Sequence, residues 1–206
     1  NLKKYCAYGY FPFDLTPFKN IHKLPGGHNM TIDLNTMSLN KKKYWEYKIE
    51  PDYSKNENEW SEILYDLIND SVKKRLVADV PVGVFLSGGL DSSIISLLAK
   101  KNLNNELNTF SINFSESSFD ESNYSNYFSK KIGSTHHHQT IDFNNIENIC
   151  SELFSKIDEP LSDSSLISYY LLTKFAQQKV KVALGGDAAD ELFAGYDTFK
   201  AINYAN

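Results

Sequence analysis

A short segment, FLSGGLDSS at residues 85–93, combines small residues, hydroxyl groups and one carboxylate. The apolar residues before it predict a buried strand, and the residues from Ser92 onwards predict a helix. Gly88 and Gly89 let the backbone approach a ligand closely, and a helix N-terminus attracts negative charge. Asp91 alone would repel an anion, but it suits a Mg²⁺ ion shared with phosphate oxygens. The segment therefore predicts a phosphate-binding turn, although a capped strand-to-helix turn without a ligand uses the same residue types.

A second segment, VKVALGGDAADELFAGY at residues 180–196, repeats this order of apolar strand, small residues and acids. Gly185 and Gly186 would leave room for a flat base or a phosphate. Three acids follow on a turn or at a helix start: Asp187, Asp190 and Glu191. If this part is helical, the spacing places Asp187 and Glu191 on one face. Acids that only stabilise a helix N-terminus are the simpler interpretation. Because parallel strands end at one edge of a sheet, we expect the two segments to open on the same edge.

Apolar periodicity predicts the elements that position these segments. An amphipathic helix is expected at 60–76, where apolar residues recur every three or four positions. Strands and helices then alternate, which is typical of an α/β fold in which a parallel sheet has helices on both faces. The expected strands are 82–86, 107–114, 137–142 and 180–186, and the expected helices are 92–101, 120–133, 144–156 and 164–178. The 120–133 helix is expected to present Tyr124, Tyr127, Phe128 and Ile132 on one face and to end at Gly133.

Residues 1–47 differ in character, being rich in aromatic residues, Pro and Gly. A half-buried strand is expected at 28–34, followed by a polar hairpin turn at 35–43. Residues 48–59 are polar and charged and predict a linker. We therefore predict the β-rich end of one domain at 1–47 and a second domain, also incomplete, at 60–206.

Composition excludes some classes of protein. The formal net charge of −5 gives no support for nucleic-acid binding, and no apolar run is long enough to span a membrane. Hydrophobic residues at 41% and charged residues at 23% fit a soluble globular protein, which we expect in the cytoplasm. Cys6 and Cys150 are predicted to be buried free thiols, with a disulfide as the alternative. His136, His137 and His138 are consecutive, and strand neighbours point to opposite faces, so we do not expect a shared metal.

Five segments together resemble the glutamine-dependent asparagine synthetases. The glycine-rich turn alone resembles the pyrophosphate-binding loop of ATP pyrophosphatases of the adenine-nucleotide α-hydrolase type, which other synthetases share. The segments are VPVGVFLSGGLDSS, FDESNYSNYFSKKIGSTHHH, DEPLSDSSLISYYLLTKFA, VKVALGGDAADELFAGY, and YGYFPFDLTPFKNIHKLPGGHNMTID with YW at 44 and 45. The resemblance covers nearly the whole chain, and the segments are specific as a set.

The resemblance implies an adenine-nucleotide α-hydrolase-like fold, preceded by the end of an N-terminal-nucleophile glutaminase domain, and it implies ATP and Mg²⁺. By position, the residues implied to bind ATP are Leu86, Ser87, Gly88, Gly89, Asp91, Ser92, Ile112, Gly185 and Gly186. Asp91 and Asp190 are implied as Mg²⁺ ligands, and Asp187 and Glu191 as catalytic residues. Gly185 stands where the family usually has Ser, which puts one hydrogen bond to the ligand in doubt.

The implied reaction has two steps. The side-chain carboxylate of aspartate attacks the α-phosphate of ATP and releases pyrophosphate, and ammonia from glutamine then displaces AMP to form an amide. The glutaminase nucleophile and the catalytic Lys of the family are expected outside this chain, which we expect to be inactive alone. A homodimer of the full-length protein is compatible with the resemblance. Two alternatives stay open: an amidotransferase acting on polysaccharide or peptide precursors, and a non-catalytic ATP-binding module of the same fold, which would not need the three acids.

Overall fold

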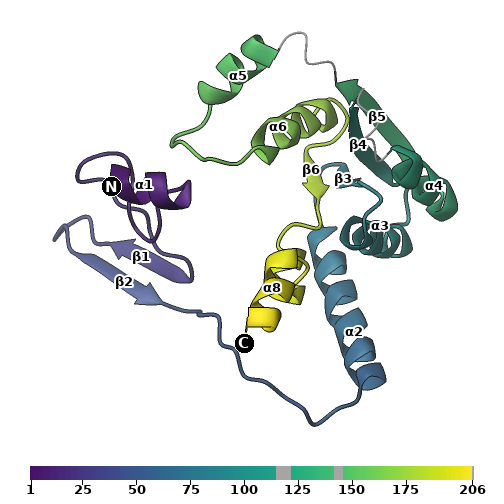
Figure 1. Cartoon of the computed structure of the whole chain (residues 1–206), viewed down its shortest axis with the longest axis horizontal. Helices are drawn as coiled ribbons and strands as arrows, with labels where there is room; N and C mark the ends of the chain where they lie inside the picture. The colour runs from purple at the N-terminus through teal and green to yellow at the C-terminus, as the bar shows by residue number, and fades with distance from the viewer. Residues whose placement is uncertain (115–121, 142–145, 206) are drawn as a thin grey trace. The chain divides into compact units, whose positions relative to one another are not determined.

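The computed structural model describes residues 1–114, 122–141 and 146–205, which lie in two compact units (Figure 1). Unit 1 comprises residues 1–55 and 150–166, and unit 2 comprises residues 56–149 and 167–206. Unit 1 thus combines the N-terminal segment with a later one. The units do not test the predicted domain bounds at 47 and 60, which stay a prediction.

Unit 2 is built on a parallel sheet of four strands in the order β5-β4-β3-β6. The chain runs from β3 outwards through β4 to β5, and β6 then returns to the other side of β3. Such a reversal of direction opens a crevice at the carboxyl ends of the strands, where ligands bind in open α/β sheets. The strands are β3 (Val82–Phe85), β4 (Asn108–Phe114), β5 (Thr135–Ile141) and β6 (Val182–Leu184). The predicted parallel sheet is confirmed.

Helices cover both faces of this sheet, as predicted (Figure 1). On one face, Val84 packs in a buried cluster with Leu98 of α3 (Leu90–Asn102) and Val72 of α2 (Glu57–Arg75). On the other face, Phe110 packs with Ala176 of α6 (Ser165–Ala176). The remaining helices are α1 (Leu2–Tyr8), α4 (Ser122–Ile132), α5 (Ile146–Phe154), α7 (Ala189–Phe193) and α8 (Asp197–Ala205).

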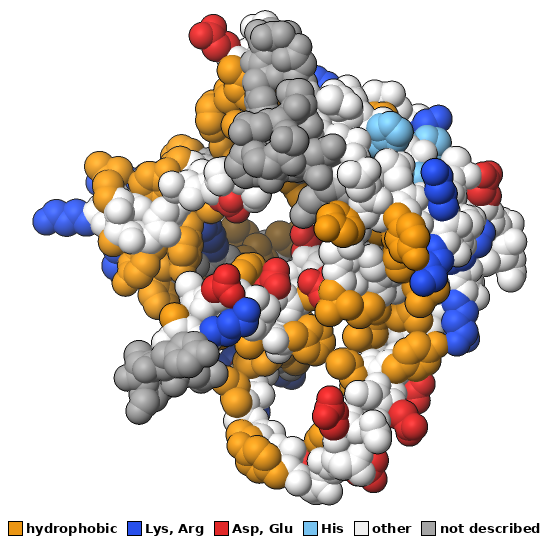
Figure 2. All heavy atoms as spheres, turned by 45° about the vertical axis from the view of Figure 1, so that its right-hand side comes forward, with side chains coloured by type: hydrophobic (Ala, Val, Ile, Leu, Met, Phe, Trp, Pro, Cys, Tyr) orange, Lys and Arg blue, Asp and Glu red, His pale blue; other side chains and the backbone are white. Residues whose placement is uncertain are grey.

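The core of unit 2 lies around β3 and β4, directly behind the strand ends. The largest fully buried side chains among the described residues are Phe110, Leu86, Leu107, Val84, Thr109, Ser96 and Ser125. Many large apolar side chains elsewhere are exposed, as Figure 2 shows on one face. Within the described part of the chain, no helix combines the length and the apolar character needed to cross a membrane.

Helix α2 begins at Glu57, three residues before the predicted start at 60 and inside the predicted linker. The reason is a capping box. The Asn56 side chain accepts a hydrogen bond from the Glu59 N–H at 3.1 Å, and the Glu59 carboxylate accepts one from the Asn56 N–H at 2.9 Å. These two bonds satisfy donors that a helix start leaves free. Apolar periodicity begins only at Trp60, so it could not predict a helix start that is set by polar capping residues.

The packed face of α4 differs from the prediction. Tyr124 and Tyr127 are about two-thirds exposed, whereas Ser125 and Ser129 are buried. Serine is small enough for the helix to lie close to the sheet, and each hydroxyl donates to a carbonyl of its own helix. Of the four residues expected on one face, Ile132 packs against the core cluster while the two tyrosines stay exposed, because close packing here favours small side chains. The predicted end at Gly133 is confirmed by its left-handed φ of 66°.

The three consecutive histidines alternate across β5, as predicted. His137 stacks on Phe110 with ring centroids 5.2 Å apart, on one face of the sheet. His136 lies on the other face, where its two ring nitrogens are 2.9 Å from Thr109 Oγ1 and 3.2 Å from Ser111 Oγ. Among the described residues, no group of three or more His, Cys, Asp or Glu side chains is placed to hold a metal. His137 and His136 thus contact opposite faces of the sheet.

We expect His136 to make unit 2 less stable in mild acid. Burial, with smaller contributions from the charges of His138 and His137, lowers the pKa of His136 from 6.5 to about 4. Between these values the unfolded chain binds more protons than the folded one, so stability falls as pH drops through this window. From pH 7 to pH 5 the loss should be about 1–2 kcal/mol. Urea unfolding at both pH values should show a smaller loss of unfolding free energy for His136→Gln than for the unaltered protein. His28→Gln is the control for the substitution itself. Equal losses in the unaltered protein and both variants would contradict this prediction.

Unit 1 contains a short antiparallel hairpin of β1 (His28–Ile32) and β2 (Leu39–Lys43). The predicted strand at 28–34 is confirmed in part, but the predicted turn at 35–43 was wrong, because its second half pairs as β2. The turn itself is held by Asp33, whose carboxylate accepts hydrogen bonds from the N–H groups of Asn35 and Thr36. Strand β1 is mostly exposed rather than half-buried.

An ion pair joins the two chain segments of unit 1. Lys23 Nζ lies 2.5 Å from Glu159 Oε1 and donates a second hydrogen bond to the Phe11 carbonyl at 3.1 Å. Both cysteines also lie in this unit and are free, as predicted, but Cys6 is exposed rather than buried.

Candidate functional site

The turn after β3 is organised by its own hydroxyl groups. The Gly89 N–H donates to Ser87 Oγ at 3.2 Å, and the hydroxyls of Ser87 and Ser92 lie 3.0 Å apart. Ser92 in turn donates to the Gly89 carbonyl at 3.1 Å. Gly89 is the N-cap of α3 and offers no side-chain cap. The first N–H groups of the helix therefore have no side-chain acceptor from the cap, which is the arrangement that binds phosphate at a helix start.

Gly88 fits a position where no other residue would. Its φ is 95°, in the left-handed region. A Cβ added there would lie 2.6 Å from Tyr124 Cβ and 2.7 Å from the Ser125 backbone nitrogen. The start of α4 thus packs directly onto this turn, and Gly88 provides both the conformation and the space.

Leu86 and Ile112, the two residues implied to contact adenosine, lie on neighbouring strands. The Leu86 N–H donates to the Phe110 carbonyl at 2.8 Å, and its side chain is completely buried. A contact from Leu86 to a nucleotide would therefore come from its backbone. Ile112 is half-buried on β4, opposite Gln139 of β5.

The ends of β3 and β6 meet at their glycines. A Cβ added at Gly186 would lie 2.9 Å from Asp91 Cβ and 3.2 Å from the Ser92 backbone nitrogen. The absence of a side chain at 186 therefore lets the two segments touch, as expected from their places in the sheet. Strands β3 and β6 pair in parallel with Val84 opposite Leu184, which aligns the two turns.

The three acids after β6 do not share one helical face. Asp187 lies in the turn before α7, and Ala188 has a left-handed φ of 68°. The condition for placing Asp187 and Glu191 on one face is not met, because the chain is not helical until Ala189; the acids instead lie on a turn and at a helix start, the other placement expected. Glu191 accepts a hydrogen bond from the Tyr196 hydroxyl at 2.8 Å.

Asp190 is turned toward Gly195. Its carboxylate occupies the place where a Cβ of Gly195 would be, and its carbonyl accepts the Gly195 N–H at 2.9 Å. The structure thus brings Asp91 and Gly186 together, whereas Asp190 and Glu191 make their contacts with the turn that follows α7.

Tyr169 was not among the predicted site residues. It lies on α6 and packs edge to face on Phe85, with ring centroids 5.8 Å apart. Burial and the charge of Asp187 raise the pKa of the Tyr169 phenol above 10. No signal in the sequence distinguishes Tyr169 from the other tyrosines, because its relation to Asp187 depends on α6 lying beside the end of β3.

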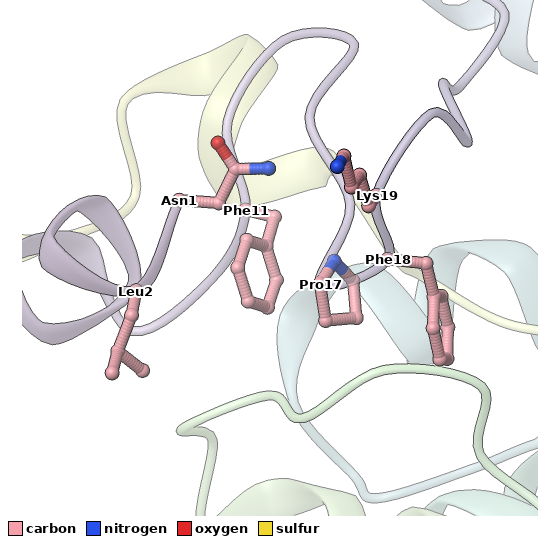
Figure 3. A pocket seen from close by; sticks show the side chains of 6 residues that line it. All are labelled: Asn1, Leu2, Phe11, Pro17, Phe18 and Lys19. Atoms are coloured by element: carbon pink, nitrogen blue, oxygen red, sulfur yellow. The ribbon is translucent and has the colours of Figure 1, made fainter.

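Two pockets of unit 1 contain none of the predicted residues. One, of about 380 Å³, is lined by Asn1, Leu2, Phe11, Pro17, Phe18 and Lys19 (Figure 3). The other, of about 590 Å³, includes the paired side chains of Lys23 and Glu159. The second pocket therefore lies between the two chain segments of unit 1, whereas the first is formed by residues 1–19 alone.

Comparison with known proteins shows related sequences along nearly the whole chain. A protein-family model described as asparagine synthase matches residues 64–206. The chain is 36% identical over 198 residues to a putative asparagine synthetase (glutamine-hydrolyzing) 2 from Methanocaldococcus jannaschii, covering 94% of this chain and 38% of that relative. It is 32% identical over 199 residues to asparagine synthetase (glutamine-hydrolyzing) 1 from Bacillus subtilis, covering 97% of this chain and 31% of that relative.

Among solved structures, the chain is similar to an NH3-dependent NAD synthetase from Campylobacter jejuni. The TM-score is 0.44 at 19% identity, and the match covers 66% of this chain and 60% of that one. The chain spans less than two fifths of the length of the two curated relatives described above.

Proposed function

Because the chain belongs to the asparagine synthase family, we propose that this protein is an ATP-dependent ligase that converts a carboxylate into an amide. The carboxylate is the side chain of aspartate, and the nitrogen is ammonia released from glutamine. The names of the relatives support this choice of substrates.

The observation that carries the proposal is the contact between the two glycine-rich strand ends. Gly186 of the second lies against Asp91 and Ser92 of the first. A simple nucleotide-binding turn needs only the first segment, with its hydroxyls and helix N-terminus. The second segment adds three carboxylates near the same sheet edge. Nucleotide binding alone does not require these acids, whereas a reaction between a phosphate and a carboxylate could use them to hold a metal ion or to orient the reacting groups.

The turn after β3 is proposed to hold the β- and γ-phosphates of ATP. Ser87 and Ser92 supply hydroxyl groups, and Gly88, with no side chain, lets the backbone approach the phosphates closely. The start of α3 adds its positive dipole end. Leu86, Ile112, Gly185 and Gly186 are proposed to lie along the adenosine.

Asp91 is placed to hold a Mg²⁺ ion, whereas Asp190 would have to turn away from Gly195 to join it. The Asp91 carboxylate lies in the first turn of α3, next to the proposed phosphate site, and phosphate oxygens are proposed as the other ligands. Mg²⁺ usually binds through one or two carboxylates together with substrate phosphates. Asp91 and Asp190 are proposed as these carboxylates. When bound, Mg²⁺ would offset the negative charge on the phosphates.

The proposed reaction has two steps, adenylation of the carboxylate and amide formation. In the first step the aspartate carboxylate forms a bond to the α-phosphorus while the bond to pyrophosphate breaks. Backbone N–H groups at the start of α3 would stabilise the negative charge that builds on the leaving pyrophosphate. In the second step ammonia attacks the acyl carbon and AMP leaves. Asp187 is proposed to act next to the acyl-adenylate, and Glu191, held by Tyr196, to support it.

The assay that tests this proposal measures pyrophosphate release by the full-length protein with ATP, Mg²⁺ and one carboxylate at a time. We expect release that depends on aspartate, and asparagine as the product when glutamine or ammonia is added. Release with a sugar or peptide carboxylate but not with aspartate would support the ligase activity and identify a different substrate. ATP binding without release for any acceptor would leave a nucleotide-binding module and contradict the proposal.

A further inference from the structure

An aromatic pair lies beside the strand end that carries Asp187. Phe85 is the last residue of β3, and its Cδ2 atom lies 3.8 Å from the place of a Cβ at Gly185. Tyr169 packs on Phe85 at an interplanar angle of 81°. Because β6 is the neighbour of β3, the pair reaches from α6 across the end of the sheet to the turn that holds Asp187.

Gly185 lets the Asp187 carboxylate lie on this aromatic side. Oδ2 of Asp187 occupies the space that any side chain at 185 would fill. The Asp187 carboxylate and the Phe85 ring therefore both border the place that a side chain at residue 185 would occupy.

Tyr169 is suited to donate a hydrogen bond to an anion here. Its side chain is 45% exposed, so the ring is held by Phe85 while part of the residue stays open to solvent. The phenol is protonated near neutral pH, and burial, followed by the charge of Asp187, raises its pKa further. A protonated phenol near a carboxylate can donate, and a carboxylate can only accept.

We propose that Tyr169 is a positioning residue for Asp187. When substrate draws the carboxylate away from Gly185, the Tyr169 hydroxyl donates a hydrogen bond to it and keeps it directed at the reacting groups. Phe85 holds the tyrosine ring for this task. The inference rests on the proposed function, which gives Asp187 its role beside the acyl-adenylate.

The kinetic test uses Tyr169→Phe in the full-length protein. Phenylalanine keeps the ring contact with Phe85 and removes only the hydroxyl. We expect kcat for aspartate-dependent pyrophosphate release to fall about tenfold or more, while KM for ATP changes less than about twofold. Tyr170→Phe is the matched control on the same helix; its ring contact with Lys174 would remain, and kcat should be unchanged. A purely structural role would instead give Tyr169→Phe the kinetics of the unaltered protein.

A spectroscopic test does not depend on activity. In full-length protein labelled with 3-fluorotyrosine, the ¹⁹F resonance of Tyr169 is the one that Tyr169→Phe removes. We expect Asp187→Asn to shift this resonance and Asp197→Asn, an exposed acid of α8, to leave it in place.

The two tests separate the two ideas. Absence of pyrophosphate release with every acceptor would defeat the proposed function, and the fluorine resonance would still decide the pairing of Tyr169 with Asp187. A resonance that ignores Asp187→Asn, or an active protein in which Tyr169→Phe has normal kcat, would overturn the positioning role.

Discussion

The Asp91→Asn protein is expected to release pyrophosphate at least about 100-fold more slowly than the unaltered protein. Asparagine keeps the shape of the side chain beside Gly186 but removes the charge that Mg²⁺ would need. The fold should survive, because a carboxylate in the first turn of a helix contributes only about 0.3–1 kcal/mol. The loss should therefore appear in the rate and not in the urea midpoint.

Asp79→Asn is the matched control for this experiment. Asp79 is exposed, lies three residues before β3, and carries the same charge. Pyrophosphate release is measured for the three proteins over a series of Mg²⁺ concentrations. We expect added Mg²⁺ to restore part of the rate of Asp91→Asn, since weaker binding is compensated by mass action. A normal rate at low Mg²⁺ would show that the Asp91 charge only stabilises the first turn of α3.

Replacing Gly88 by alanine is expected to damage both the site and the stability of unit 2. The new Cβ would collide with Tyr124 and with the backbone of Ser125, which cannot move without shifting α4. The φ of 95° adds strain for any residue with a side chain. Together these effects should lower the free energy of unfolding by about 2–5 kcal/mol. We also expect pyrophosphate release to be lost, because the turn would open.

Gly133→Ala separates the two causes. Gly133 also has a left-handed φ, 66°, but a Cβ there would have no atom within 4 Å. This variant has the conformational strain without the collision, so its free energy of unfolding should fall by about 1–2 kcal/mol. Urea unfolding of both variants gives the comparison. If Gly88→Ala were no less stable than Gly133→Ala, the contact between the turn and α4 would be looser than the structure places it.

The local elements of unit 2 could be predicted because each has a local cause. Val82 to Leu86 form an apolar run that glycines interrupt, so the strand and its turn are visible in the sequence. The same holds for β6 and the pair Gly185 and Gly186. Helix bounds were less accurate where a polar cap decided them, as at Asn56, since hydrophobic periodicity does not report hydrogen bonds.

Choices between faces were harder to predict. The exposed tyrosines and buried serines of α4 reverse the order that hydrophobicity suggests, because the space between α4 and the sheet admits only small side chains. The placement of Asp187 outside α7 has a similar origin. The left-handed Ala188 delays the helix by two residues, and no pattern in the sequence indicates this.

By itself, the sequence determined the residue types at the two strand ends: glycines where backbone must approach backbone, hydroxyls, and acids that could share a cation with phosphates. Tertiary structure alone decided that β6 lies beside β3, that Gly186 touches Asp91, and that Tyr169 packs on Phe85, which borders Gly185. The physical reason is the distance along the chain over which each kind of interaction acts. Periodicity and turn chemistry act over a few residues, whereas these contacts join residues tens of positions apart and form only when the sheet orders its strands.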